Sequence, residues 1–209
     1  MKSCVICGGG ASIIEGINSN LWEHIKGQDI WSLNWAYKTM PYLPSRELFI
    51  DTSFFTKSIN ELWGLWKQGV ACYAKAHPKY KYILDIHSLP TTRFSEQYNE
   101  KIYIGEKSLC GFFALSLACK EHYDVIYLLG FDFGSLDGTK NTHYYQGKID
   151  VPSAGVGHPE LYLTPEAKVS DWEIYLKEPC KIYNVSPKSR IECFDKINYP
   201  TFYKLLENK

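Results

Sequence analysis

The sequence predicts an α/β protein: a single Rossmann-like domain with a mostly parallel sheet, helices on both faces and a lid segment. Short apolar runs typical of strands alternate along the chain with amphipathic segments of helical period. The chain also opens with a strand-like run, a glycine-rich turn and a helical segment, the order found in the first βα unit of nucleotide-binding domains. Both observations predict a ligand cleft at one edge of the sheet.

The composition fits one nucleotide-binding α/β domain over residues 1–209. Hydrophobic residues make up 45% of the chain, and 23 basic residues balance 23 acidic ones. Because no Lys/Arg block is present, we expect no broad nucleic-acid surface. No signal peptide or membrane-length apolar run is visible, and the seven cysteines follow no disulfide spacing, so a reduced, cytoplasmic protein is expected.

The first predicted strand, residues 3–7, is followed directly by the turn GGGAS and by a predicted helix over 13–25. Glycines let the backbone approach a phosphate, the N–H groups at a helix start favour anions, and Ser12 is placed to cap the helix. The turn is expected to contact a nucleotide phosphate through Gly8, Gly9, Gly10 and Ser12. It is not the GxGxxG fingerprint and lacks a P-loop lysine, so a plain tight turn remains the alternative. We interpret Cys4 and Cys7, within the strand, as core thiols.

The alternation of strands and helices continues to the end of the chain. Further strands are predicted over 29–33, 48–50, 81–86, 124–130 and 181–184. Helices are predicted over 56–73, 110–121, 165–177 and 199–209. In the first of these helices, Trp63 and Trp66 are expected to pack in the core. The loop after the strand over 124–130 is rich in polar and glycine residues, and we interpret about 134–165 as a lid or connector.

Polar or glycine residues follow five of the predicted strands. In a parallel sheet the carboxyl ends of the strands share one edge, and ligands bind there. The residues expected to line this cleft are Gly8, Gly9, Gly10, Ser12, Asn34, Asp51, Gly130, Asp132 and Ser186. Asn34 offers donors and an acceptor to a base or ribose edge, or is only a turn residue. Asp132 is a candidate for binding ribose or a divalent cation, although no Asp-x-Asp motif indicates metal dependence.

The loop that follows the strongest predicted strand delivers His143, Tyr144 and Tyr145. An imidazole changes charge near neutral pH, so His143 is a candidate general base for an acceptor hydroxyl. The tyrosine hydroxyls are placed to donate hydrogen bonds to a departing phosphate. Lys107 and Lys188 are candidates to balance the phosphate charge. The structural alternatives are a locally hydrogen-bonded loop histidine and solvated surface lysines.

Several short motifs occur in an order that resembles a known group of enzymes. They are CVICGGGASI, SLNWAY, LFIDTSFF, SLCGFFALSLACKEHYDVIYLLGFDFG, NTHYY and IYNVSPKSRI. Together they resemble bacterial sialyltransferases of the family that includes the Campylobacter lipooligosaccharide enzymes. They are also similar to a Rossmann superfamily domain of flagellin-glycosylation proteins, archaeal 6-hydroxymethylpterin pyrophosphokinase and short phage-encoded relatives. The resemblance covers nearly the whole chain.

The sialyltransferase resemblance implies a Rossmann-like domain that binds a CMP-sugar without an essential metal. The positions that it assigns to the nucleotide or its phosphate are Gly8, Gly9, Gly10, Ala11, Ser12, Asn34, Asp51, Lys107, Cys110 and Gly111. Asp51 stands where the family has Asn, Lys107 where it has Arg, and Cys110 where it has Ser. The family's base lies in a His-Tyr-x-x-His stretch, and this chain, which reads HYYQG from His143, keeps only the first histidine.

The residues and the resemblance lead to three functional hypotheses. The first is a metal-independent glycosyltransferase that uses a nucleotide-activated sugar, a CMP-sugar or similar, and a glycan or other hydroxyl acceptor, with His143 as general base. The second is a Mg²⁺-dependent phospho- or pyrophosphotransferase of the pterin type, with ATP as donor and Asp132 or Asp51 holding the metal. The third is a non-catalytic nucleotide-binding module. The lid and the abundant tyrosines permit a homo-oligomer.

Overall fold

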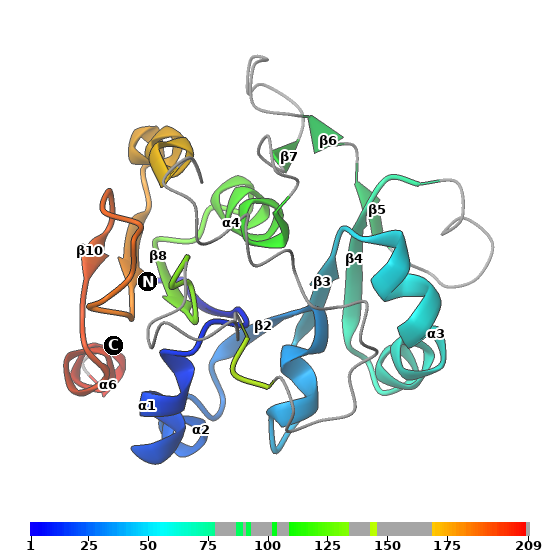
Figure 1. Cartoon of the computed structure of the whole chain (residues 1–209), viewed down its shortest axis with the longest axis horizontal. Helices are drawn as coiled ribbons and strands as arrows, with labels where there is room; N and C mark the ends of the chain where they lie inside the picture. The colour runs from blue at the N-terminus through cyan, green and yellow to red at the C-terminus, as the bar shows by residue number, and fades with distance from the viewer. Residues whose placement is uncertain are drawn as a thin grey trace.

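The computed structural model describes residues 1–77, 87–89, 91–92, 102–103, 109–133, 143–145 and 169–207. The main strands are β1 (Ser3–Cys7), β2 (Asp29–Leu33), β3 (Arg46–Phe49), β4 (Ala71–Lys75), β5 (His87–Leu89), β8 (Val125–Leu129), β9 (Lys181–Asn184) and β10 (Asp195–Lys196). They form one sheet in the order β10-β9-β8-β1-β2-β3-β4-β5, and every neighbouring pair is parallel (Figure 1). The predicted α/β fold class is confirmed.

The remaining described elements are mostly helical. The α-helices are α1 (Ile13–Asn18), α2 (Leu21–His24), α3 (Thr52–Lys67), α4 (Cys110–Lys120) and α6 (Tyr199–Glu207). Two 3₁₀ helices, η1 (Asn34–Thr39) and η4 (Val169–Lys177), and a short parallel pair, β6 (Thr91–Thr92) with β7 (Ile102–Tyr103), complete the fold. Within the described part of the chain, no helix is both long and apolar enough to cross a membrane.

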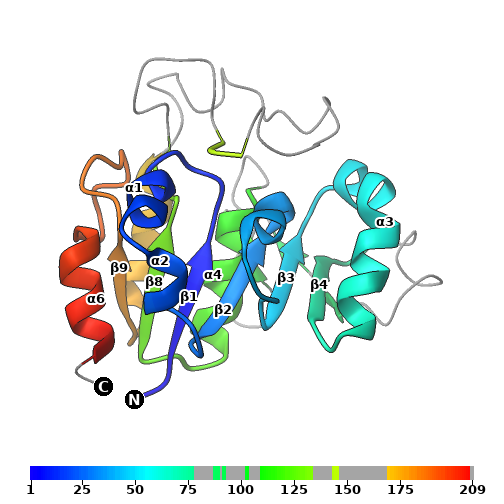
Figure 2. The ribbon, with the colours of Figure 1, turned by 90° about the horizontal axis from the view of Figure 1, so that it is seen from below.

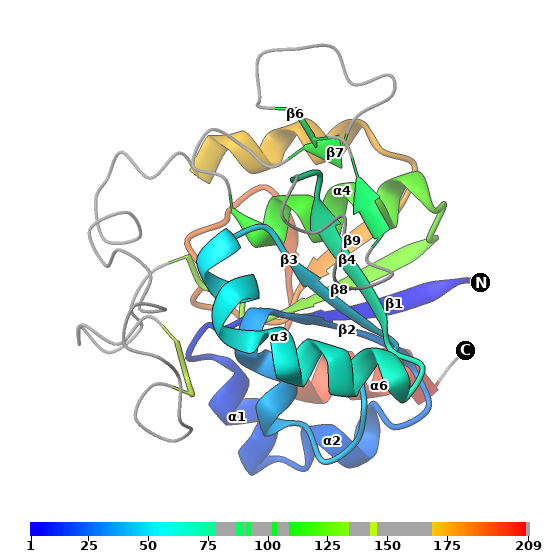
Figure 3. The same ribbon diagram turned by 90° about the vertical axis from the view of Figure 1, so that its right-hand side faces the viewer.

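Helices cover both faces of the sheet. Figure 3 shows α1, α2, α3 and α6 on one face and α4 with η4 on the other. Successive side chains of a strand point to opposite faces, so β1 contributes to two cores. Val5 and Cys7 join the cluster beneath α1, α3 and α6, whereas Cys4 and Ile6 join the cluster beneath α4 and η4. Cys4 and Cys7 are both 0% exposed, which confirms the interpretation as core thiols.

The path of the chain creates a switch point beside β1. From β1 the chain builds the sheet outward through β2, β3, β4 and β5, and it then returns through α4 to place β8 on the other side of β1. In open parallel sheets, ligands bind outside the carboxyl ends of the strands at such a reversal of strand order. The segments that follow β1 and β8 therefore lie at the position where a ligand is expected. The N-terminus and the last described turn of α6 lie near the opposite, amino edge of the sheet (Figure 2).

Local backbone geometry corrects two predicted helices. The helix expected over 56–73 ends at Lys67, because Gly69 has a left-handed φ of +89° and Val70 N–H closes the helix end on Leu65 O at 3.1 Å. The residues that follow then form β4 instead of continuing the helix. The helix expected over 13–25 is divided into α1 and α2 by Asn20, which has a φ of 61°.

Other predicted segments are only partly described. The expected helix over 165–177 is the 3₁₀ helix η4 in its described part. The predicted strand over 81–86 lies outside the described residues, as does the lid over about 134–165 apart from residues 143–145. That one domain spans residues 1–209 stays a prediction.

The tryptophan pair of α3 lies on the surface and not in the core. Trp63 is 40% exposed and Trp66 is 36% exposed, and their ring centroids are 5.3 Å apart. The face of α3 that packs on the sheet carries Phe54, Phe55, Ser58, Leu62 and Leu65. The tryptophans are next to Leu62 and Leu65 in sequence, so they point about 100° away from that face. The core prediction for them is wrong, because the phenylalanines at the start of the helix set its buried side.

A buried carboxyl group lies beneath α3. Glu47 on β3 is 0% exposed, and neither of its carboxyl oxygens has a well-formed hydrogen bond among the described residues. Burial raises the pKa of Glu47 well above its ordinary value, and the hydroxyl of Ser32, its register partner on β2, opposes that shift only in part. Glu47 is therefore held in the protonated form over a wider pH range than in the unfolded chain.

A Glu47→Gln variant is expected to resist unfolding better than the wild type at pH 8 and equally well near pH 4. The unfolded glutamate ionises near its ordinary pKa of about 4.3, so the stability of the wild type falls as pH rises through the higher pKa of the folded state. Glutamine does not ionise, and the gain at pH 8 is expected to exceed about 1 kcal/mol. Urea unfolding of both proteins at the two pH values measures this, and equal pH dependence of the two proteins contradicts it.

Candidate functional site

The glycine turn after β1 packs directly on the segment after β8. Gly8 N–H donates to Leu129 O at 2.8 Å, and Gly10 N–H donates to Gly130 O at 2.8 Å. A Cβ on Gly10 would lie 2.5 Å from Gly130 O, and one on Gly8 would lie 2.9 Å from the same atom. These distances are too short for any side chain, so the close approach of the two segments requires glycine. The glycine turn expected from the sequence thus packs against the segment after β8 at the switch point.

Asp132 lies inside this turn and is not open to solvent. Its side chain is 1% exposed, and Oδ2 accepts a hydrogen bond from Ser12 N–H at 2.7 Å. The carboxyl group therefore satisfies a donor at the start of α1, while Ser12 makes no capping hydrogen bond with its own side chain. Burial raises the pKa of Asp132. Its backbone oxygen accepts from Arg190 N–H at 2.9 Å, which joins the loop after β9 to the same centre.

The segment of His143, Tyr144 and Tyr145 rests on the glycine turn. Tyr144 N–H donates to Gly9 O at 2.7 Å, and a Cβ on Gly9 would lie 2.1 Å from Cδ2 of His143. The imidazole therefore covers the α-carbon of Gly9. Figure 2 shows this segment, in yellow-green, on the carboxyl side of the strands. The structure thus brings together two site segments that lie more than a hundred residues apart in the sequence.

The imidazole of His143 is uncharged at neutral pH. Burial lowers the pKa of His143 to about 4, and its ring centroid lies 5.2 Å from that of Tyr145. A neutral imidazole is able to accept a proton from a bound hydroxyl.

The two tyrosines are core residues in this structure. Tyr144 is 4% exposed and Tyr145 is 3% exposed. The Tyr144 hydroxyl pairs closely with the Thr39 hydroxyl and also reaches Ala36 O at 3.5 Å, so it is held by η1. Burial raises the pKa of Tyr144. Thr39 and Ala36 are site residues that the sequence did not suggest. Ala36 lies within the motif SLNWAY but contributes only its backbone oxygen, and Thr39 lies outside the quoted motifs.

Buried polar atoms without a well-formed hydrogen bond gather along this edge of the sheet. Within the described part of the chain, they include Ser12 Oγ, Asn34 Oδ1, Asp132 Oδ1 and Ser186 Oγ. These residues follow β1, β2, β8 and β9, which are neighbours in the sheet. The hydroxyls of Ser12 and Ser186 nevertheless interact with the Asp132 carboxyl group and oppose the rise of its pKa in part. Asn34 also has a left-handed φ of 54° at the end of β2. Strained backbone and unpaired buried polar atoms are costly and are concentrated where proteins bind ligands.

The other predicted site residues that the structure describes lie outside the contact between the glycine turn and the His143 segment. Cys110 begins α4, and its thiol donates to Leu48 O at 3.3 Å, so it reaches the end of β3. Gly111 packs against Phe131, where a Cβ would lie 2.7 Å from Cε1. Asp51 and Lys188 are exposed at the same edge, and Lys107 lies outside the described residues. Among the described residues, no three His, Cys, Asp or Glu side chains come together as a set of metal ligands.

Comparison with known proteins identifies the fold. No family model and no curated protein matches the sequence. The structure, however, is similar to the sialyltransferase CstII from Campylobacter jejuni in complex with the substrate analogue cytidine-5′-monophosphate. The TM-score is 0.58 at 16% identity, and the match covers 94% of this chain and 85% of that one. The chain has the sialyltransferase fold.

A second sialyltransferase structure gives the same result. It is a tyrosine-to-phenylalanine variant of the Campylobacter enzyme in complex with CMP, with a TM-score of 0.55 at 14% identity and coverage of 94% of this chain and 86% of that one. The sialyltransferase fold agrees with the fold that the sequence resemblance implies. It establishes the architecture around the switch point, and the chemistry has to be argued from the residues of this chain.

Proposed function

We propose that the protein is a glycosyltransferase that takes a nucleotide-activated sugar, with a CMP-sugar as the expected donor, and a hydroxyl acceptor. The observation that carries this proposal is the set of buried polar atoms without a well-formed hydrogen bond at the ends of β9, β1 and β2, which belong to Ser186, Ser12 and Asn34. A nucleoside presents hydroxyl, amide and carbonyl groups that match such a set, and binding it would satisfy atoms that are otherwise costly to bury.

The donor would lie across the switch point. Three N–H groups of the turn already donate hydrogen bonds inside the protein, those of Gly8, Gly10 and Ser12. The turn would therefore contact the phosphate through the N–H groups of Gly9 and Ala11. The side-chain amide of Asn34 would form hydrogen bonds with the nucleoside. This assignment narrows the phosphate contacts that were predicted for the whole turn. Asp132 would act as a positioning residue, because its buried carboxyl group orients the turn and does not reach the donor.

His143 would serve as the general base. Its neutral imidazole would take the proton of the acceptor hydroxyl as the acceptor oxygen forms a bond to the sugar, and the bond between the sugar and the nucleotide phosphate would break. The nucleotide would leave as the monophosphate. Tyr144 would hold the histidine against Gly9 through its contacts with Thr39 and Ala36, and this role replaces the direct phosphate contact expected from the sequence.

Saturating CMP, at about a hundred times its Kd, is expected to raise the melting temperature by roughly 5–10 °C without added Mg²⁺. Thermal shifts with CMP, UDP, GDP and ATP, each with and without Mg²⁺, measure this. Asn34→Gly should lose most of the CMP shift, because glycine keeps the left-handed backbone and removes only the amide. Lys67→Ala, at an exposed position of α3, is the matched control and should keep the shift.

The same thermal shifts, together with an assay of sugar transfer, separate the three hypotheses. Stabilisation by ATP that requires Mg²⁺ would favour the phosphotransferase. Stabilisation by CMP without sugar transfer to any hydroxyl acceptor would favour a binding module. No shift with any of the four nucleotides would contradict every nucleotide-based function.

A further inference from the structure

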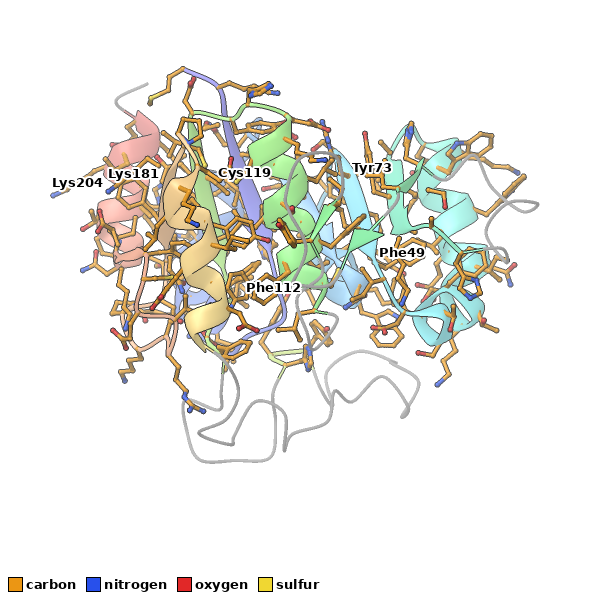
Figure 4. The ribbon with its side chains drawn as sticks, turned by 90° about the horizontal axis from the view of Figure 1, so that it is seen from above. Phe49, Tyr73, Phe112, Cys119, Lys181 and Lys204 are labelled. Atoms are coloured by element: carbon orange, nitrogen blue, oxygen red, sulfur yellow. The ribbon has the colours of Figure 1, made fainter. Side chains whose placement is uncertain are left out.

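Two cysteines that are distant in sequence meet on the face of the sheet covered by α4. Cys119 lies in the last turn of α4, and Cys180 immediately precedes β9, 61 positions later in the sequence. Their sulfur atoms are 3.6 Å apart and share a hydrogen bond, and both are free thiols. Figure 4 labels Cys119 on α4, on the same face of the sheet as η4. None of the proposed steps of sugar transfer uses this pair.

The two thiols differ in their access to solvent. Cys119 is 5% exposed, whereas Cys180 is partly exposed and lines a surface pocket of about 180 Å³. The walls of the pocket include Tyr175, Glu178 and Cys193. A small oxidant in solution is therefore able to reach Cys180, whereas Cys119 is buried next to Cys180.

The pKa values of the two thiols favour Cys180 as the nucleophile that attacks a peroxide. The hydrogen bond between the two sulfurs lowers the pKa of Cys180, whereas the same hydrogen bond and burial raise the pKa of Cys119. A thiolate, and not a thiol, is the nucleophile toward peroxides. A solvent-accessible cysteine of lowered pKa with a second thiol beside it is the arrangement found in redox-sensing pairs.

We propose that Cys119 and Cys180 form a redox-sensitive pair that hydrogen peroxide converts into a disulfide. The Cys180 thiol first releases its proton to solvent, and the thiolate attacks one peroxide oxygen. The O–O bond breaks, Cys180 becomes a sulfenic acid, and the hydroxide that leaves takes up the released proton to form one water. The Cys119 sulfur then attacks the Cys180 sulfur, the S–O bond breaks, and the hydroxide takes up the Cys119 proton and leaves as the second water. The two thiols are oxidised by two electrons in total, and the peroxide is reduced to two waters.

The geometry requires only a small movement. A disulfide has an S–S distance of about 2.05 Å, so the two sulfurs must approach by about 1.5 Å. Cys180 is free to make this adjustment because it lies before the first residue of β9 and makes no ladder pair itself. Cys193 lines the same pocket and is the competing partner.

The disulfide would join the ends of a chain segment that carries part of the candidate site. Residues 120–179 include β8, Asp132 and His143, and the bond would close this segment into a loop. The pair lies at the amino end of β9, whereas the candidate cleft lies at the carboxyl ends of the strands. Oxidation is therefore expected to raise the melting temperature by roughly 5–15 °C and to leave the CMP-induced shift in place. This inference does not depend on the proposed function.

Peptide mapping of the peroxide-treated full-length chain tests the proposal. The folded protein is treated with hydrogen peroxide, unreacted thiols are alkylated after denaturation, and the peptides are analysed by mass spectrometry without reduction. We expect a Cys119–Cys180 cross-linked peptide that a dithiol reductant removes. A Cys180–Cys193 peptide, or complete alkylation of Cys119 and Cys180 after treatment, would overturn the proposal.

Three variants test the order in which Cys180 and Cys119 react. Cys180→Ser should slow peroxide-dependent thiol loss by about 10-fold or more, because the accessible nucleophile is removed. Cys119→Ser should let a dimedone probe trap the sulfenic acid on Cys180. Cys193→Ser is the matched control and should form the disulfide at the wild-type rate. Oxidation of Cys180→Ser at the wild-type rate would contradict the assignment even if Cys119→Ser failed to fold.

Discussion

A His143→Ala variant is expected to transfer sugar about 10²- to 10⁴-fold more slowly than the wild type, which is the usual contribution of a positioned general base. The expectation rests on the proposed role of the imidazole, which covers Gly9 at the switch point and is held there by Tyr144. Release of the nucleotide monophosphate from the donor, in the presence of acceptor, measures the rate. Binding of CMP should change little, because the base contacts the acceptor and not the nucleotide.

The pH dependence of the same reaction gives a second test of His143 as the general base. Because burial lowers the pKa of His143 to about 4, the imidazole stays unprotonated as pH falls from 8 to about 5. The value of kcat/KM should therefore be nearly flat over that range and should fall only as pH approaches 4.

The matched control for both measurements is His122→Asn. His122 is exposed after the end of α4 and has a left-handed φ of 57°, which asparagine accepts. This variant should keep the wild-type rate and pH profile. A normal rate for the His143→Ala variant would exclude the imidazole as base, even if CMP binding were confirmed.

Replacing Gly10 by alanine is expected to lower the free energy of unfolding by about 2–4 kcal/mol and to abolish the CMP-induced thermal shift. The added Cβ would lie 2.5 Å from Gly130 O and 2.5 Å from Asp132 Oδ2. Neither atom is at the end of a flexible side chain, since one is backbone and the other belongs to a carboxyl group that is 1% exposed. The contact between the turn after β1 and the segment after β8 must open to accept the methyl group.

Gly64→Ala is the matched control for Gly10→Ala. Gly64 lies within α3, and a Cβ there meets no atom within 4 Å. Alanine is favoured over glycine in a helix by about 1 kcal/mol, so this variant should be slightly more stable than the wild type and should keep the CMP shift. Urea unfolding of the three proteins measures the differences. An unchanged stability of Gly10→Ala would show that the turn tolerates a side chain and is not held by close packing.

The local sequence was informative where a single periodicity dominated. The strands β1, β2 and β8 were predicted almost to the residue, because strands buried on both faces appear as short apolar runs. The bounds of β9 were also predicted, although its burial alternates. The strand β4 was missed, because the residues of Ala71–Lys75 alternate in burial and follow a helix without a proline. In α3 the tryptophans suggested the wrong buried side, since hydrophobicity alone does not show which face meets the sheet.

The convergence of the site was also predictable from the sequence. Once the strands are parallel, Gly8, Asn34, Gly130 and Ser186 must share the carboxyl edge, because every strand points the same way. The order of β8, β1 and β2 then places the glycine turn at the centre. Strand direction alone therefore fixes the edge of the sheet at which these residues meet, without any side-chain contact.

The sequence by itself determined the α/β class, the core thiols, the glycine turn and the edge of the sheet at which a ligand is expected, because each of these follows from local pattern and strand direction. Only the tertiary structure decided what the polar residues do at that edge. Asp132 meets Ser12 across 120 positions, and Tyr144 meets Thr39 across 105. Such contacts depend on how loops pack after the sheet has formed, and no local pattern encodes them. The His143 segment identified in the sequence is therefore held against the glycine turn by partners that the sequence did not reveal.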